Sequence, residues 1–158
     1  MTIAGPIERS IAVMAATPHW LIAVLARFSI AAVFWKSGQT KIEGFKLDLV
    51  NGTIELGMPR FAEATLDLFR DEYKVPVLSP ELAAVLATAA EHALPALILV
   101  GLATRFAALG LLGMTAVIQV FVYPDAYPTH GVWAVALLYL IARGPGPLAL
   151  DRWLARSA

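Results

Sequence analysis

The sequence predicts an all-α membrane protein: a four-transmembrane-helix bundle with an amphipathic helix in a long first loop. Of its 158 residues, 59% are hydrophobic and 15% are charged, whereas soluble domains carry about 25% charged residues. The apolar residues gather in stretches near the length of about 20 residues that a helix needs to cross a bilayer. Within residues 20–35, 82–103, 106–122 and 131–142 the only permanent charges are Arg27 and Glu91. One membrane domain over residues 1–158 is therefore expected.

The first two spans have recognisable helix starts. Residues 19–38 follow Pro18, and proline suits the first turn of a helix. Residues 80–103 follow Ser79, whose hydroxyl can cap the helix, with Pro80 at its first position. We expect both stretches to cross the membrane.

Two further spans complete the expected bundle. Residues 104–123 are apolar and stop before Pro124. Residues 129–143 end at the Gly144–Pro147 run, and their length of about 22 Å is short for a crossing. Neighbouring helices can support such a short span.

The first loop contains a helical pattern over residues 58–74. Apolar residues recur there at helical spacing, with charged residues on the opposite face. Such a helix lies on the membrane surface or caps the bundle. It is either a packing element or a surface that binds a partner. The apolar positions are Met58, Phe61, Ala62, Leu66, Phe69 and Tyr73.

Charge indicates the orientation and excludes some partners. Arginine is dense in the short segments that share a side with both termini, which places the N-terminus and the C-terminus in the cytoplasm. The formal net charge is zero, so we expect no nucleic-acid partner. The chain has no cysteine, which excludes disulfide exchange and thiolate metal sites.

Glu91 and Arg27 are the first candidates for a functional site. On antiparallel spans their depths differ by about 6 Å, which predicts an ion pair between the first two helices. The pair either fixes the helix register or binds a ligand or proton. Pro95 leaves the carbonyl of Glu91 without its helical donor. His92 is expected to be a hydrogen-bonded residue between helices rather than a metal ligand.

The third span and the following loop supply the remaining candidates. Thr115, Gln119 and Tyr123 are spaced by four residues and form a polar stripe that faces the bundle interior. They are either polar contacts between helices or one wall of a cavity. His130 and Asp125 lie at the outer mouth and could help to bind a cation, but the ligand spacing of a metal site is lacking.

Several short motifs run through the chain. They are Arg27, the step from Gly38 to Lys41, Glu91–Pro95, Gly101–Leu109, Met114–Pro124, Pro128–Trp133, Arg143–Gly146 and Leu150–Asp151. Together they resemble the DoxX family of small bacterial integral membrane proteins. The resemblance implies a four-helix bundle in the bacterial inner membrane. Members of the family resemble the small subunit of a thiosulfate:quinone oxidoreductase, act in membrane oxidoreductase complexes for oxidative or thiol stress, or are encoded beside modified metal-binding peptides. A distant eukaryotic relative is a receptor assembly chaperone.

The function expected first is that of an accessory subunit in a redox or stress-response system. Arg27, Glu91 and Gln119 would form a polar intramembrane pocket for a quinone, and we expect no catalysis by this chain alone. Two alternatives stay open: a small-solute or metal transporter, and a scaffold or assembly factor for a membrane or periplasmic partner protein. A homo-oligomer is also plausible, because three glycines permit close helix approach. These are Gly101, Gly110 and Gly113.

Overall fold

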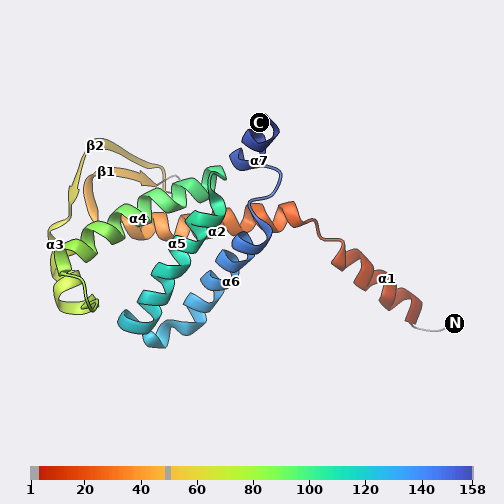
Figure 1. Cartoon of the computed structure of the whole chain (residues 1–158), viewed down its shortest axis with the longest axis horizontal. Coiled ribbons are helices and arrows are strands. Elements are labelled where there is room, and N and C mark those ends of the chain that lie inside the picture. Colours follow the sequence, from red (N-terminus) through yellow and green to blue (C-terminus); the bar gives the residue numbers. More distant parts are fainter. Residues whose placement is uncertain (1–3, 49–50, 158) are drawn as a thin grey trace.

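The computed structural model describes residues 4–48 and 51–157, and they form mostly helices with one two-stranded hairpin (Figure 1). The bundle consists of α2 (His19–Gln39), α4 (Pro80–Val100), α5 (Thr104–Val117) and α6 (Tyr127–Arg143). α2 packs against α4, and α6 packs against α5 and α2. A π-helix, η2 (Ile118–Val122), continues α5.

Among the described residues, three helices are long and apolar enough to cross a membrane by length and composition. They are α2, α4, and α5 together with η2. The fourth expected span corresponds to α6, which has 17 residues and is too short to be counted with them. α6 is nevertheless part of the bundle, because its Leu137 and Leu140 are completely buried.

The helix ends follow from local capping. Leu82 donates its backbone N–H to the hydroxyl of Ser79 at 3.3 Å, so Ser79 is the N-cap of α4, as expected. α4 ends at Val100 rather than at residue 103, because Gly101 adopts the left-handed conformation with φ 76°, which terminates helices.

The N-terminus of α5 is capped from a distant part of the chain. The carboxylate of Asp151 accepts the backbone N–H groups of Ala103 at 2.7 Å and Thr104 at 3.0 Å. Asp151 belongs to α7 (Leu150–Ser157). A carboxylate is favourable at a helix N-terminus, so this contact fastens α7 to the turn between α4 and α5.

The first loop differs from the expected surface helix. It begins with an antiparallel hairpin of β1 (Ile42–Asp48) and β2 (Thr53–Phe61). Residues 58–61 were expected to be helical, and this is wrong: Arg60 and Phe61 pair with Glu43 and Ile42 of β1. In the described part of this loop, helix is confined to α3 (Glu63–Asp67) and the π-helix η1 (Leu68–Tyr73).

A short helix that the sequence did not predict precedes the bundle. α1 (Ala4–Ala15) extends away from the bundle beyond the start of α2 (Figure 1). Its described side chains are exposed. It therefore takes no part in the hydrophobic core.

The hydrophobic core has two separate parts. The main core joins all four bundle helices, and its largest completely buried side chains are Ile30, Phe34, Ile98, Leu111, Leu137 and Leu140. The second part is small: Phe69 of η1 lies on Ala83 and Ala84 of α4. The first half of α4 thus packs on the loop rather than on the other bundle helices.

Candidate functional site

A buried ion pair joins Lys41 to Glu91. Lys41 Nζ lies 2.7 Å from Glu91 Oε2, and the two side chains are only 4% and 5% exposed. Ser37 completes the group, because its hydroxyl donates to Glu91 Oε1 at 2.9 Å and accepts from Lys41 Nζ at 3.2 Å. Two opposite charges are tolerated at this depth because each is paired and hydrogen-bonded.

Backbone contacts of Lys41 tie the pair to three elements. Lys41 follows α2 and precedes β1. Its carbonyl oxygen accepts the N–H of Ala62 at 3.1 Å and the hydroxyl of Thr65 at 2.9 Å. Glu91 adds α4, so α2, the hairpin, α3 and α4 all meet at this ion pair.

The expected ion pair between Arg27 and Glu91 is wrong. The Arg27 guanidinium instead donates to four backbone carbonyl oxygens near the opposite end of α4. The acceptors lie at the end of α4 and in the segment before α7, and are Ile98 at 2.9 Å, Leu99 at 2.6 Å, Pro145 at 3.2 Å and Leu148 at 2.5 Å. Arg27 thus ties the last turn of α4, where carbonyl groups lack their regular helical donors, to the segment before α7, so it is a structural clamp.

Close contact between α2 and α4 positions Glu91. A Cβ atom on Gly38 would come within 2.8 Å of His92 Cε1 and 3.1 Å of Glu91 Cβ. Only glycine allows the two helices to approach this closely without displacement. Glu91 is thereby held at the level of the C-terminal end of α2.

His92 connects α4 to the hairpin. His92 Nδ1 lies 2.8 Å from the Thr88 carbonyl oxygen, and Nε2 lies 3.0 Å from Gln39 Nε2. A carbonyl can only accept and an amide nitrogen can only donate, which assigns the proton of a neutral imidazole to Nδ1. Gln39 Oε1 accepts the N–H of Leu47 in β1 at 2.7 Å. His92 is thus hydrogen-bonded between helices, as expected.

A cavity of about 430 Å³ opens beside the ion pair. This volume is typical of sites for small organic ligands. Its polar lining includes Ser37, Lys41, Glu91, Tyr123 and His130, and the rest is mainly apolar. The apolar residues come from α2, η1, α4, α5, η2 and α6, and include Phe34, Phe69, Leu86, Met114, Val117, Ile118, Val122 and Trp133.

Three sequence candidates are arranged differently from the expected polar stripe. Tyr123 and His130 line the cavity. Gln119 stands behind His130: its Oε1 lies 2.8 Å from His130 Nδ1, and its Nε2 donates to the Pro124 carbonyl at 2.6 Å. Thr115 donates to the Leu111 carbonyl of its own helix at 2.7 Å, so it lies outside the cavity lining.

Of the two residues expected at the outer mouth, His130 lies at the cavity and Asp125 does not. His130 is 5% exposed and faces the cavity, whereas Asp125 is exposed in the 3-10 turn η3 (Pro124–Ala126). Asp125 is absent from the described cavity lining. A shared cation site of these two residues thus finds no support in their placement.

Two tyrosines and a glutamate form the rim of the cavity. The rings of Tyr73 and Tyr123 meet edge to face at 5.8 Å, and the Tyr123 hydroxyl donates to Glu72 Oε1. Burial, together with this bond to Glu72, raises the pKa of Tyr123 above its ordinary value. Tyr123 therefore remains a neutral hydroxyl at physiological pH.

Sequence reasoning did not place Lys41, Ser37 or Tyr73 in the site, although Lys41 belonged to a family motif. Ser37 and Lys41 are four residues apart, the spacing that places side chains on one helix face. That spacing could have indicated that Ser37 and Lys41 act together. Lys41, however, lies just outside the apolar stretch, where a lysine is expected to be a surface residue. Tyr73 belonged to the predicted amphipathic face, and no sequence pattern placed it beside Tyr123.

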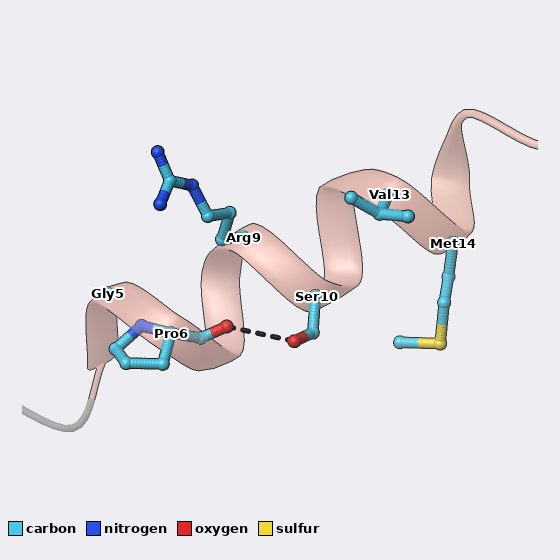
Figure 2. A pocket seen from close by; sticks show the side chains of 6 residues that line it. All are labelled: Gly5, Pro6, Arg9, Ser10, Val13 and Met14. Carbon is cyan, nitrogen blue, oxygen red and sulfur yellow. Dashed lines mark hydrogen bonds between the residues drawn. The ribbon is translucent and has the colours of Figure 1, made fainter.

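A second hollow runs along α1 alone. Figure 2 shows that it is lined by one face of this helix, where the Ser10 hydroxyl donates to the Pro6 carbonyl at 3.0 Å. A hollow made by a single exposed helix encloses nothing, so it is not a candidate site. The lining residues are Gly5, Pro6, Arg9, Ser10, Val13 and Met14.

The fold defines a small helical membrane protein with a cavity beside a buried ion pair. The chain belongs to the DoxX family, whose family model matches residues 22–124. The match runs from α2 to the start of η3 and includes Lys41, Glu91 and Tyr123. Neither a curated protein nor a solved structure matches the chain in sequence.

Proposed function

We propose that the cavity binds a quinone-like molecule and that the protein is an accessory membrane subunit of a redox or stress-response system. The observation that carries this proposal is the buried Lys41–Glu91 pair in the wall of a mainly apolar cavity. Ligand sites combine apolar walls with a few polar groups that orient the ligand. A quinone has that composition: carbonyl groups on a flat ring and an apolar tail.

The polar groups match both oxidation states of such a ligand. Lys41 Nζ can exchange one of its two contacts with Ser37 for a quinone carbonyl, and the Glu91 carboxylate can accept from a quinol hydroxyl. In the neutral tautomer with the proton on Nδ1, His130 Nε2 is a further acceptor. The cavity therefore offers donors and acceptors for the two forms.

The packing favours binding over passage through the protein. Between Arg27 and Ser37, α2 contributes Ile30 and Phe34, which are almost completely buried in the main core. A transport path would need a polar or water-filled route through this region. A flux assay in liposomes is expected to show no solute movement.

Quinone binding can be measured through the cavity's own tryptophan. Trp133 lines the cavity, and a short-chain benzoquinone in contact with it should quench its fluorescence. With the protein in nanodiscs, we expect quenching that saturates as the quinone concentration rises. Glu91→Gln and Lys41→Met should each weaken the affinity for the quinone at least tenfold. Glu55→Gln, which changes an exposed carboxyl group in β2, is the matched control. Unchanged binding in both cavity variants, shown to be folded, would refute the proposal.

A second candidate function is that of a scaffold, and the hairpin favours it. Ile54, Leu56 and Met58 of β2 are 59%, 80% and 88% exposed, which is unusual for an apolar strand face. The partner would be a membrane or periplasmic protein. The partner should no longer co-purify when Ile54, Leu56 and Met58 are all replaced by serine. If every partner still co-purifies with that variant, this surface is not the binding site.

We place the protein in the bacterial inner membrane with both termini in the cytoplasm. Arg105 and Gly144 lie together, since a Cβ on Gly144 would be 3.5 Å from Arg105 Nη2. Arg143 and Arg152 flank the same segment, and basic residues concentrate on the cytoplasmic side. Cysteine labelling from each side tests the orientation.

Of the three glycines expected to permit close helix approach, Gly113 is the one with open space around it, because Gly101 and Gly110 already lie against Ala149 and Leu94 of the same chain. A homo-oligomer that uses these glycines would therefore form its contact at Gly113.

A further inference from the structure

Residues 63–78 cover the cavity on its loop side. From this segment Phe69, Tyr73, Val75 and Leu78 line the cavity, and Phe69 is 4% exposed. The segment comprises α3, η1 and the connection to α4. A ligand entering from this side has to displace it.

The cover is attached by far fewer apolar contacts than the bundle. Phe69 lies on two alanines, Ala83 and Ala84, with Leu66, Tyr73 and Ala87 packed around them. The main core is separate and contains much larger side chains from four helices. Regions with few buried apolar contacts open most readily.

The connection between the cover and α4 is strained. Lys74 has φ 41° and Val77 has φ 75°, and a β-branched residue with positive φ is a genuine outlier. Val77 is fully exposed, so no side-chain packing explains its conformation. Strained backbone of this kind is typical of segments that switch between two arrangements.

Two polar contacts hold the cover closed. Glu72 accepts a hydrogen bond from Tyr123, and Arg70 Nη2 lies 3.1 Å from Glu81 Oε1. All four side chains are exposed at least in part, so water can compete for them. By contrast, the beginning of the segment is fixed, because buried Thr65 donates to the Lys41 carbonyl.

We propose that residues 68–78 form a gate that swings on the strained residues Lys74 and Val77, latched by Glu72 and Tyr123. The gate controls entry to the cavity. That the entering ligand is quinone-like rests on the proposed function. η1 opens while α3 stays attached to Lys41. Opening exposes the Lys41–Glu91 pair to the incoming ligand.

Thiol labelling tests the gate without any ligand. The chain has no cysteine, so Ala87→Cys places a single thiol in the cavity wall under Phe69. Its reaction rate with N-ethylmaleimide reports how often the gate opens. Glu72→Ala removes the latch and should raise the rate about three- to tenfold, the worth of one ordinary hydrogen bond, because water competes for this exposed pair.

Relief of the backbone strain at Val77 should change the labelling rate in the direction opposite to Glu72→Ala. Val77→Asn accepts the left-handed conformation more easily and stabilises the closed gate. The labelling rate should then fall about fivefold or more, since relief of one strained residue is sufficient for that. Asp71→Ala, an exposed acid next to Glu72, is the matched control and should leave the rate unchanged.

Equal labelling rates in all variants would overturn the gate. So would an Ala87→Cys thiol that reacts in the parent protein as fast as Ala89→Cys on the exposed face of α4. With benzoquinone as probe, Glu72→Ala should speed association and dissociation by the same factor. Changed thiol labelling without any benzoquinone binding would refute the proposed ligand and leave the gate intact.

Discussion

The Lys41–Glu91 pair allows the sharpest prediction about stability. Lys41→Met keeps the length of the side chain but removes its charge, and leaves the Glu91 carboxylate buried with Ser37 as its remaining partner. Exposed ion pairs contribute about 0–1 kcal/mol. With side chains only 4% and 5% exposed and a 2.7 Å contact, this pair belongs to the buried class, in which loss of one partner costs about 3–5 kcal/mol.

A double-mutant cycle separates the pair from its surroundings. Lys41→Met should lower the free energy of unfolding by about 3–5 kcal/mol. Glu91→Gln should cost less, because Lys41 Nζ keeps its contacts with the Ser37 hydroxyl and carbonyl oxygen. The double variant has no buried charge here and should recover much of the loss, so that the coupling energy reaches about 2–3 kcal/mol.

Reversible unfolding in mixed micelles measures these free energies. Lys46 and Glu55, which face each other across the hairpin, provide a control cycle, and their coupling should stay below about 1 kcal/mol. If the costs of Lys41→Met and Glu91→Gln simply add, the two side chains do not depend on each other and the buried pair is refuted.

Three further predictions concern the clamp, the helix contact and the rim. Arg27→Ala removes the guanidinium that donates to four carbonyl groups and should lower the free energy of unfolding by about 3 kcal/mol or more. Arg27→Lys should recover only part of this loss. A loss below about 1 kcal/mol in Arg27→Ala would contradict the clamp. Gly38→Ala should separate α2 from α4 and cost about 1–3 kcal/mol, whereas Gly113→Ala, with open space around it, should cost nothing, as thermal unfolding can show. Burial and the bond to Glu72 raise the pKa of Tyr123 in the folded protein. The neutral Tyr123 hydroxyl therefore contributes its full stabilisation of the fold below about pH 10, the pKa of tyrosine in the unfolded chain, and this stabilisation is lost as the pH rises further. Tyr123→Phe should reduce the loss of stability at alkaline pH, and an unchanged dependence of stability on pH would contradict this.

The bundle was largely predictable because its signals are local. Apolar stretches of sufficient length, Ser79 with Pro80, and Pro124 mark the helices without knowledge of their neighbours. The hairpin also had a local signal, since Asn51-Gly52 is a frequent turn between paired strands. Helical spacing over residues 58–74 competed with it, and pairing with β1 decided the outcome for residues 58–61.

The partner of Glu91 was not predictable from span lengths. Rise per residue places Arg27 near Glu91 only if α2 and α4 begin and end at the same levels. In the structure the first half of α4 extends past α2 and packs on η1 through Ala83 and Ala84. Glu91 consequently meets Ser37 and Lys41 at the end of α2, and Arg27 meets Ile98. The level of α4 depends on the loop, which no pattern within the spans reveals.

Photo-crosslinking tests the central claim about the cavity most directly. An azido-benzoquinone bound to the protein in nanodiscs should label cavity residues on α4, η2 and α6, such as Leu86, Ile118 and Trp133. Labelling should compete with unmodified quinone and fall at least tenfold in Glu91→Gln. Crosslinks that spread over the lipid-facing surface, or that persist unchanged in folded Glu91→Gln, would contradict a quinone site beside the Lys41–Glu91 pair.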